Sequence, residues 1–309
     1  MKTVSVVIPI LNGADTLDAL FERFSAVEAD ILAMGIALHF ILVDDGSTDR
    51  TYASMLDWKN RKSNISVLKL SRNWGAIAAS NAGLQHVKGD AFTLYSSDLQ
   101  DPPELIPEMC RRWQTGKKFI ICQREKERKD PLVTRLFARL YYKLVKWLVM
   151  DKFPETGFDI FLLDSAYLPY LRHTGKNINR SLYTYWLGLN PDVITYHRPQ
   201  RHSGKSKWTF SRKVKLFIDS FLGFSMKPIR LFILIGLLVS ALSFIYGTTV
   251  VIGALLGNIN VPGYASLAVI LSFMFGLVFL LLGVIAEYLW RIFDEVNKRP
   301  ESVVETFVE

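Results

Sequence analysis

The feature that most constrains this chain is a run of uncharged residues that extends without interruption from Leu231 to Ala286. A transmembrane helix needs about 20 apolar residues, so this run is too long for a single span. The sequence GNINVPG at 257–263 divides it into two apolar stretches, about 230–256 and 265–289. A mean hydropathy of +0.19 favours lipid over the alternative, a helical hairpin buried in a soluble core. We therefore expect a C-terminal hairpin of two transmembrane helices.

The charges beside this run predict its orientation. Lys227 and Arg230 precede the first span, Arg291, Lys298 and Arg299 follow the second, and the loop between the spans is uncharged. Because positive charge tends to stay on the cytoplasmic side, we expect both termini and everything before the spans in the cytoplasm. The N-terminal sequence runs directly into a strand-like segment, so no signal peptide is expected. The prediction is a multi-pass protein of the inner (cytoplasmic) membrane.

The net charge of +8 is concentrated in the middle of the chain. Residues 101–230 hold 25 Lys and Arg against 12 Asp and Glu, whereas the segments on either side are slightly acidic. A basic segment that leads into membrane spans is typical of contact with anionic lipid headgroups or phosphate substrates. Nucleic acid is the competing partner, but no nucleic-acid-binding motif accompanies the charge. The two cysteines, Cys110 and Cys122, lack disulfide or metal-site spacing and suit a reducing compartment.

Before the spans, strand-like and helix-like segments alternate. Short runs rich in apolar residues predict strands at 4–10, 38–43, 65–70, 91–96 and 117–123, and the first of them is rich in β-branched residues. Segments with helical spacing of apolar residues, closed by glycine or opened by proline, predict helices at 16–34, 75–87 and 102–114. This alternation indicates an α/β fold with a mostly parallel, doubly wound sheet, whose ligands bind at the carboxyl ends of the strands.

Two further segments, 131–150 and 211–226, predict cationic amphipathic helices with wide apolar faces. Such helices can lie in the membrane interface, with lysines extending to the headgroups and aromatic side chains inserted. For the first segment, packing on the sheet is an equal alternative; for the second, the interface is favoured because a membrane span follows.

These segments predict the domain organisation. It comprises a cytoplasmic α/β domain at 1–210, which would carry the functional site, an interfacial amphipathic helix at 211–228, the two transmembrane helices within 229–290 and a cytoplasmic tail at 291–309.

Acidic residues follow the predicted strands where a doubly wound sheet places its crevice. Asp44 and Asp45 follow one strand, Asp98 and Gln100 follow another, and Asp159 lies beyond the last predicted strand. Carboxylates in such a crevice can bind a ribose or base, hold a divalent ion or accept a proton. Each position is weak evidence by itself, because Asp-Gly pairs also form ordinary turns.

Basic residues form a second candidate group. Arg124 and Arg128 follow a predicted strand, and the sequence RHSGKSKW at 201–208 combines glycine, hydroxyl and cationic side chains. This composition fits a phosphate or pyrophosphate, which backbone N–H groups and charged donors bind well. The alternative is a juxtamembrane polybasic stretch that contacts lipid headgroups, and loop composition does not separate the two.

Several motifs occur in a fixed order along nearly the whole chain: VVIPILNGADTL, ILVDDGSTDRT, LSRNWGAIAASNAGL, SSDLQDPPE, GFDIFLLD and SGKSKWTF. Together they resemble family 2 glycosyltransferases of the GT-A fold. The C-terminal sequence from VPGYASLAV to DEVNKRP resembles the paired spans of the polyprenyl-phosphate glycosyltransferase branch. That branch includes dolichyl-phosphate mannose synthases and bacterial undecaprenyl-phosphate glucosyltransferases. The resemblance implies a GT-A-like mixed sheet with a transmembrane hairpin.

The resemblance also implies roles for matching positions. Asp44 and Asp45 would bind the base and ribose of a nucleotide, with Pro9 shaping the pocket. Asp98 and Gln100 match the metal-binding motif and imply Mg²⁺ or Mn²⁺ on the donor diphosphate. Asp159 matches an aspartate near the acceptor phosphate, the candidate catalytic base. Positions that match donor or acceptor phosphate ligands are Arg124, Arg128, Arg201, Ser206 and Lys207.

The implied reaction is inverting transfer of a sugar from a nucleotide sugar to polyprenyl phosphate, with UDP-glucose the leading donor and a homo-oligomer the expected assembly. Two departures from the pattern bear on it. Ser96 stands where many relatives have the first metal-binding aspartate, and Gly13 replaces an acidic residue usual after Asn12. They leave open a catalytically impaired nucleotide-sugar-binding scaffold. A transferase with a non-lipid acceptor is the other alternative, although the Q-x-x-R-W motif of processive members is absent from the sequence.

Overall fold

The structure is a computed structural model that describes residues 1–125, 132–154, 157–158, 160–174, 178–197, 217–221, 223–225, 227–256 and 263–309. The chain divides into two compact units. The first unit joins Met1–Phe217 to Pro300–Glu309, and the second comprises Ile218–Arg299. The last ten residues of the chain therefore belong to the same unit as the first two hundred.

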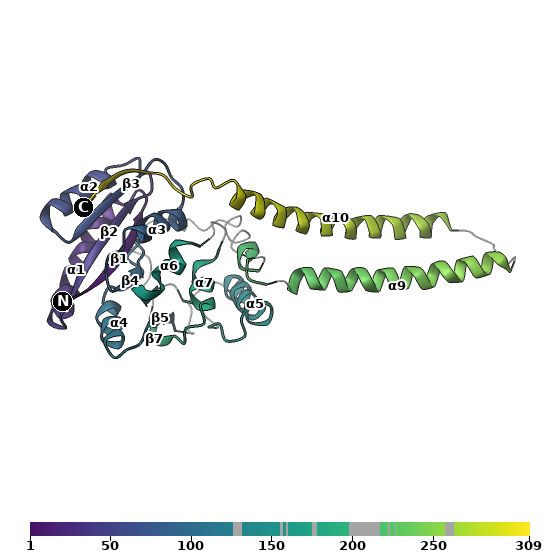
Figure 1. The fold of residues 1–309 in the computed structure, drawn as a ribbon, viewed down its shortest axis with the longest axis horizontal. Coiled ribbons are helices and arrows are strands. Elements are labelled where there is room, and N and C mark those ends of the chain that lie inside the picture. Colours follow the sequence, from purple (N-terminus) through teal and green to yellow (C-terminus); the bar gives the residue numbers. More distant parts are fainter. Residues whose placement is uncertain are drawn as a thin grey trace. The chain divides into compact units, whose positions relative to one another are not determined.

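The first unit is built on a mixed sheet, which in the described part of the chain has eight strands in the order β7-β5-β6-β4-β1-β2-β3-β8 (Figure 1). Their bounds are β1 Lys2–Ile10, β2 Ile36–Asp44, β3 Ile65–Leu70, β4 Ala91–Leu94, β5 Phe119–Arg124, β6 Ile160–Asp164, β7 Asp192–Tyr196 and β8 Val304–Val308. β6 is antiparallel to both of its neighbours and β8 to β3, whereas the other pairings are parallel.

Helices follow the strands in the alternation that the sequence predicts. Their bounds are α1 Ala14–Ala33, α2 Thr51–Arg61, α3 Ala76–Gln85, α4 Leu105–Gln114, α5 Leu132–Leu148, α6 Leu168–Arg172 and α7 Arg180–Trp186, with a 3₁₀ turn at Ser165–Tyr167. The core between α1 and the sheet is aromatic: Phe24 lies edge-on to Phe40 at 4.9 Å and to Tyr95 at 5.2 Å between ring centroids. Rings of this size bury a large apolar area, which stabilises the layer that carries the loops described below.

The five predicted strands are confirmed as β1 to β5, and the fold class is the one expected. The helix predicted at 102–114 begins later, at Leu105, because the Pro102 and Pro103 carbonyls accept turn hydrogen bonds from the Leu105 and Ile106 N–H groups. Half of the helix predicted at 211–226 lies outside the described residues, and 217–221 is helical.

The predicted helix at 131–150 is present as α5, and its C-terminal half packs on the protein. Val145 is fully buried, and the Tyr142 ring stacks on Phe153 with 6.3 Å between centroids. The opposite face leaves Leu140 and Trp147 more than half exposed. The helix is therefore packed on the protein along one side, and a position of its exposed side in the membrane interface stays a prediction.

β1 lies between β2 and β4. The strands β2 and β3 are added on one side of β1 and β4 on the other, so the strand order reverses at β1. In open α/β sheets this switch point is where the crevice for ligands forms. Val7 accepts a hydrogen bond from the Tyr95 N–H on the β4 side, and Ile10 accepts one from Asp45 on the β2 side. Since successive residues of a strand alternate sides, Pro9 faces β4, where it has no N–H to donate. The β1–β4 ladder stops there and the two strands can part.

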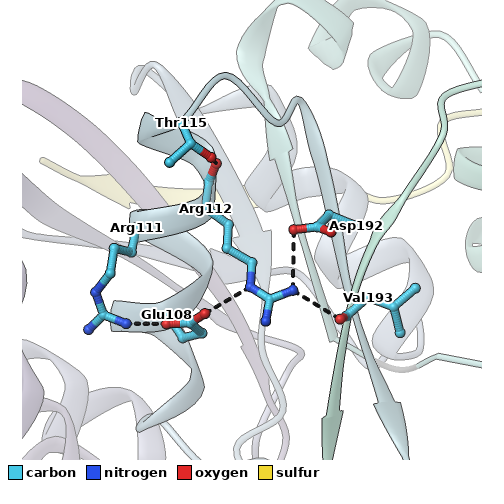
Figure 2. Close-up of polar contacts among 6 residues, drawn as sticks. All are labelled: Glu108, Arg111, Arg112, Thr115, Asp192 and Val193. Carbon is cyan, nitrogen blue, oxygen red and sulfur yellow. Dashed lines mark hydrogen bonds and ion pairs between the residues drawn. The ribbon is translucent and has the colours of Figure 1, made fainter.

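An ion-pair network fixes the outer strand β7 to α4 at the end of the sheet opposite the crevice (Figure 2). Arg112 donates to Glu108 at 2.8 Å, to Asp192 at 3.2 Å and to the Val193 carbonyl at 3.0 Å. The hydrogen bond to Glu108 raises the pKa of Arg112 further above its already high value. Because Figure 2 shows a guanidinium whose donors point at protein acceptors, we assign this network a structural role.

The second unit contains the two long apolar helices, α9 at Lys227–Leu255 and α10 at Tyr264–Val296. Within them, Ile233–Val250 and Phe273–Val296 are long and apolar enough to cross a membrane, and neither stretch is buried inside the protein. Near the end of α10, Arg291 pairs with Asp219 at 2.6 Å and with Glu287 at 3.0 Å. Glu287, the acidic residue that follows the uncharged run, thus has its counter-ion one helical turn away.

Candidate active site

The side chain of Asp44, the last residue of β2, is fully buried at the carboxyl edge of the sheet. Its Oδ1 accepts a hydrogen bond from the Ser47 N–H at 3.0 Å. Its Oδ2 is buried and has no hydrogen-bond partner among the described residues. A buried carboxylate oxygen without a partner is costly, so its retention at this edge is best explained by a ligand that donates to it.

Asp45 has a different environment, although it is the next residue. Its carboxylate accepts hydrogen bonds from the N–H groups of Trp74 at 2.7 Å and Gly75 at 3.0 Å. It therefore fixes the start of α3 beside the crevice. Gly46, with a φ of +69°, lets the loop approach the chain at Arg72 so closely that an added Cβ would lie 2.3 Å from a backbone carbon. A side chain at this position would separate the two loops.

The loop after β1 is tied to the same region. Asn12 accepts a hydrogen bond from the Thr48 N–H at 2.9 Å, and the Gly13 N–H donates to the Thr51 hydroxyl at 2.9 Å. A Cβ on Gly13 would lie 2.8 Å from Cγ2 of Ile10. The absence of an acidic residue at this position therefore has a local packing reason, which the sequence did not indicate.

The loop after β4 places Asp98 and Gln100, both half-buried, at the same edge of the sheet. Asp98 accepts a hydrogen bond from the Gln100 N–H at 3.2 Å, which folds the two side chains into one turn. Leu99 between them has a φ of +59°, a strained conformation for a leucine. Arg23 of α1 holds it by donating to the Leu99 carbonyl at 3.2 Å, and Tyr95 donates to the Asp101 carbonyl. No pattern in the sequence indicated that Arg23 would hold this loop.

These side chains fit a hard divalent ion. A carboxylate and an amide oxygen are the ligand types that Mg²⁺ and Mn²⁺ prefer, and Mg²⁺ usually takes only one or two protein carboxylates beside substrate phosphates and waters. No group of three or more His, Cys, Asp or Glu side chains suited to a metal is found within the described ranges.

Of the predicted phosphate ligands, Arg124 is described, at the carboxyl end of β5 and paired in register with Tyr196. β5 is parallel to β7 and is linked through the antiparallel β6 to β4, so Arg124 lies at the same edge as Asp44 and Asp98. The remaining predicted site residues lie outside the described part of the chain: Arg128, Asp159, Arg201, Ser206 and Lys207.

Comparison with known proteins agrees with this geometry. Residues 5–165 match the family described as Glycosyl transferase family 2. An uncharacterised glycosyltransferase of Synechocystis sp. is 31% identical over 97% of this chain and 94% of its own length. The uncharacterised glycosyltransferase YkcC of Bacillus subtilis is 30% identical over 97% and 93%. A bactoprenol glucosyl transferase of Shigella phage SfII is 29% identical over 97% of both chains.

Solved structures are more distant. The crystal structure of mannosyl-3-phosphoglycerate synthase from Rubrobacter xylanophilus is 17% identical, covers 71% of each chain and has a TM-score of 0.48. At this distance no residue role is transferred from it. The family match covers the β1–β6 region that carries Asp44, Asp98 and Arg124, and the relatives align over nearly the full length. The chain is therefore a glycosyltransferase that belongs to glycosyl transferase family 2.

Proposed function

We propose that this glycosyltransferase transfers a sugar from a nucleotide sugar to the phosphate of a polyprenyl lipid at the cytoplasmic face of the membrane. The proposed donor is UDP-glucose and the proposed acceptor is undecaprenyl phosphate. The observation that carries the proposal is the continuity of one chain from a crevice with Asp44 and Asp98 to two apolar helices of membrane-spanning length. The relative named a bactoprenol glucosyl transferase supports the choice of lipid and sugar.

Each crevice residue has a role in this reaction. The buried Oδ2 of Asp44 would accept a hydrogen bond from the base or ribose, next to Pro9, while Asp45 maintains the loop. Asp98 and Gln100 would hold Mg²⁺ or Mn²⁺, which supplies positive charge against the leaving diphosphate. Arg124, Arg128, Arg201, Ser206 and Lys207 would bind donor or acceptor phosphates by charge-assisted hydrogen bonds.

The chemical step is an inverting displacement. An oxygen of the acceptor phosphate forms a bond to the anomeric carbon while the bond from that carbon to the diphosphate breaks, and the nucleoside diphosphate leaves with the electron pair. Cationic side chains that face the growing negative charge stabilise the transition state. The acceptor phosphate is already ionised near neutral pH, so Asp159 acts by orienting it, and no proton has to be removed.

The two apolar helices explain how a soluble donor meets a lipid acceptor. Each CH₂ group moved from lipid to water costs about 0.8 kcal/mol, so a polyprenyl tail stays in the bilayer. The enzyme must therefore come to the headgroups. The pairing of β8 with β3 returns the chain after α10 to the same unit as residues 1–217. An even number of membrane crossings between the two parts satisfies this topology and supports a hairpin with both termini on one side; the positive charges beside the spans are the reason to propose the cytoplasmic side of the inner membrane.

The test uses purified full-length protein in detergent, undecaprenyl phosphate and a panel of radiolabelled nucleotide sugars, with Mg²⁺, with Mn²⁺ or with EDTA. We expect a lipid-linked product from UDP-glucose that disappears with EDTA and in an Asp98→Asn variant. A Ser97→Ala variant, altered at the neighbouring residue of the same loop, serves as the matched control and should retain turnover.

Other outcomes distinguish the alternatives. Product that survives EDTA would contradict the metal role of Asp98 and Gln100 while leaving the transfer in place. Product only with a carbohydrate or protein acceptor would replace the lipid acceptor. Nucleotide binding without turnover from any donor would replace the enzyme by a nucleotide-sugar-binding scaffold.

A further inference from the structure

Three polar side chains from separate parts of the sequence lie near one another, in a cluster that the predicted site residues do not include. They are Asn81 of α3, Arg180 at the start of α7 and Glu301 of the C-terminal segment, all half-buried. The amide of Asn81 donates to Glu301 Oε2 at 2.5 Å. Glu301 is also the carboxylate whose charge acts on the Arg180 guanidinium. The C-terminal segment thus supplies a charge to a cluster within the first unit.

The cluster lies at the carboxyl edge of the sheet. α3 starts directly after Gly75, which Asp45 holds at the crevice. The Ser71 N–H donates to the Val303 carbonyl at 3.0 Å, which places residues 300–303 beyond the carboxyl end of β3. Asn81 and Glu301 are thus connected to this edge through α3 and through residues 300–303. The third member, Arg180, is connected to it through α7.

The start of α7 is fixed to the chain that enters β6. The Ser181 hydroxyl donates to the Phe158 carbonyl at 3.4 Å. β6 begins at Ile160, and its antiparallel register, with Thr93 opposite Leu162, places that beginning at the carboxyl end of β4. Arg180, next to Ser181, therefore lies at the edge that also carries Asp98.

The cluster has unmet hydrogen-bonding capacity. Nη1 of Arg180 and Oδ1 of Asn81 are both buried without a hydrogen-bond partner in the described part of the chain. Burial lowers the pKa of Arg180 to about 10, even though Glu301 acts to raise it. Glu301 therefore does not fully offset the cost of burying this cation. A guanidinium with a free donor is suited to a phosphate oxygen, which it binds with charge assistance and defined geometry.

We propose that Arg180 is a further phosphate-binding residue of the transferase crevice, and that Glu301, held by Asn81, positions it. This rests on the proposed function, which brings two phosphate groups to the crevice, the donor diphosphate and the lipid phosphate. Both groups would present a phosphate oxygen to Arg180, and the experiment below distinguishes the donor diphosphate from the lipid phosphate. By positioning Arg180, Glu301 would make substrate binding depend on the C-terminal segment of the chain.

The experiment measures equilibrium binding of two probes, UDP and farnesyl phosphate, to the full chain in detergent, together with the melting temperature. The variants are Arg180→Gln, Arg180→Lys and Glu301→Gln. The matched control is Arg172→Gln. Arg172 also binds α3, but it donates to the carbonyls of Leu84, Gln85 and Val87 at the C-terminal end of that helix, away from the crevice. KM for donor and for lipid acceptor is measured in parallel wherever turnover is found.

We expect Arg180→Gln to weaken one probe by about tenfold to a hundredfold, as the loss of a charged hydrogen bond does. Arg180→Lys should recover part of that loss, and Glu301→Gln should weaken the same probe to a smaller extent. Weaker UDP binding with a raised donor KM assigns the donor diphosphate; weaker farnesyl phosphate binding with a raised acceptor KM assigns the lipid. Arg172→Gln should lower the melting temperature without changing either affinity.

Unchanged affinity for both probes in Arg180→Gln would overturn the inference, even if the unaltered chain turns over, and would leave Arg180 and Glu301 as a structural pair. Failure of the unaltered chain to bind either probe would overturn it too. If the unaltered chain binds a probe but transfers no sugar, and Arg180→Gln weakens that binding, the proposed function falls while the role of Arg180 stands.

Discussion

At the scale of single residues, Asp44 shows that a site residue can be recognised from the unfavourable free energy of burying a polar atom without a hydrogen bond. One oxygen of its carboxylate is bound by Ser47 and the other is buried without a partner in the described part of the chain. An Asp44→Asn variant keeps an acceptor for Ser47 but removes the buried charge. We expect UDP binding to weaken by about tenfold or more, with a melting temperature that is unchanged or raised. Isothermal titration and thermal denaturation measure the two effects.

Asp90 offers a control for this variant, because its carboxylate accepts from the Thr3 N–H at 2.7 Å at the amino end of β1. Asp90→Asn should lower the melting temperature and leave UDP binding intact. If Asp44→Asn behaved like Asp90→Asn, the buried carboxylate would be structural.

Gly13 illustrates the opposite case, a departure from the family pattern that packing explains. A side chain at this position would crowd Ile10 and Thr16, at 2.8 and 3.3 Å from its Cβ. Gly13→Ala should destabilise the protein by about 1–3 kcal/mol, as overpacking does, and Gly13→Glu by at least as much. Thermal denaturation would show this. A Gly13→Glu variant with raised melting temperature and tighter nucleotide binding would instead support the interpretation that an acidic contact is missing.

At the scale of elements, the parts of the fold that the sequence predicted are those with strong local patterns. β1, β2 and β3 are largely apolar runs buried on both faces, and α1 has a clear apolar stripe. β8 is different: VETFV shows no regular alternation of polar and apolar residues and is almost entirely exposed, and its partner β3 lies in a distant part of the sequence. A short edge strand of this kind gains its structure from the sheet, so its own residues did not predict it.

The candidate site divides in the same way. The motifs predicted Asp44, Asp98 and Arg124, and the register brings these to one edge of the sheet. Arg180 and Glu301 could not be predicted, because their relation depends on the return of the chain through β8. Arg23 was missed for a related reason: its partner is a carbonyl in a strained loop, which leaves no mark in the sequence around α1.

The strand β8 should therefore contribute to the stability of the first unit. Removal of residues 303–309, which leaves Glu301 in place, exposes the edge of β3 and removes the Phe307 ring, whose centroid lies 4.3 Å from that of His86. We expect a melting temperature lower by several degrees and a greater tendency to aggregate, because an open strand edge pairs with other chains. Glu305→Gln removes only the surface ion pair to Lys69 and should have little effect. Equal stability of the full and shortened chains would contradict the role of β8.

At the scale of the whole molecule, stability should depend on pH through two histidines. Burial lowers the pKa of His39, which lies 2.9 Å from the Ser66 hydroxyl, and of His86 beside β8. The folded state then binds fewer protons than the unfolded chain, so this contribution to stability is fully present above the ordinary pKa of 6.5 and is lost as the pH falls from there through the lowered pKa of the folded state. Melting temperatures between about pH 7.5 and 5.5 should fall, and His39→Gln should reduce the slope. An unchanged slope in that variant would assign the effect to other groups.

The topology of the chain leads to the last prediction. The first unit contains both Met1–Phe217 and Pro300–Glu309, so the segment between them must leave and return on the same side of a membrane. Cys110 and Cys122 are buried, and burial raises the pKa of both thiols to about 12, so neither should react with a maleimide in the folded protein. Labelling of a single introduced cysteine will then show on which side of the membrane that residue lies.

Two variants suffice: Tyr264→Cys at the start of α10, and Ser302→Cys between α10 and β8. In intact cells a membrane-impermeant maleimide should label Tyr264→Cys only, and after permeabilisation it should label both. Labelling of Ser302→Cys in intact cells would place the sheet outside and contradict a cytoplasmic crevice. Labelling of neither variant before permeabilisation would mean that α9 and α10 do not cross the membrane, and the crevice would then have to reach its lipid through surface contacts alone.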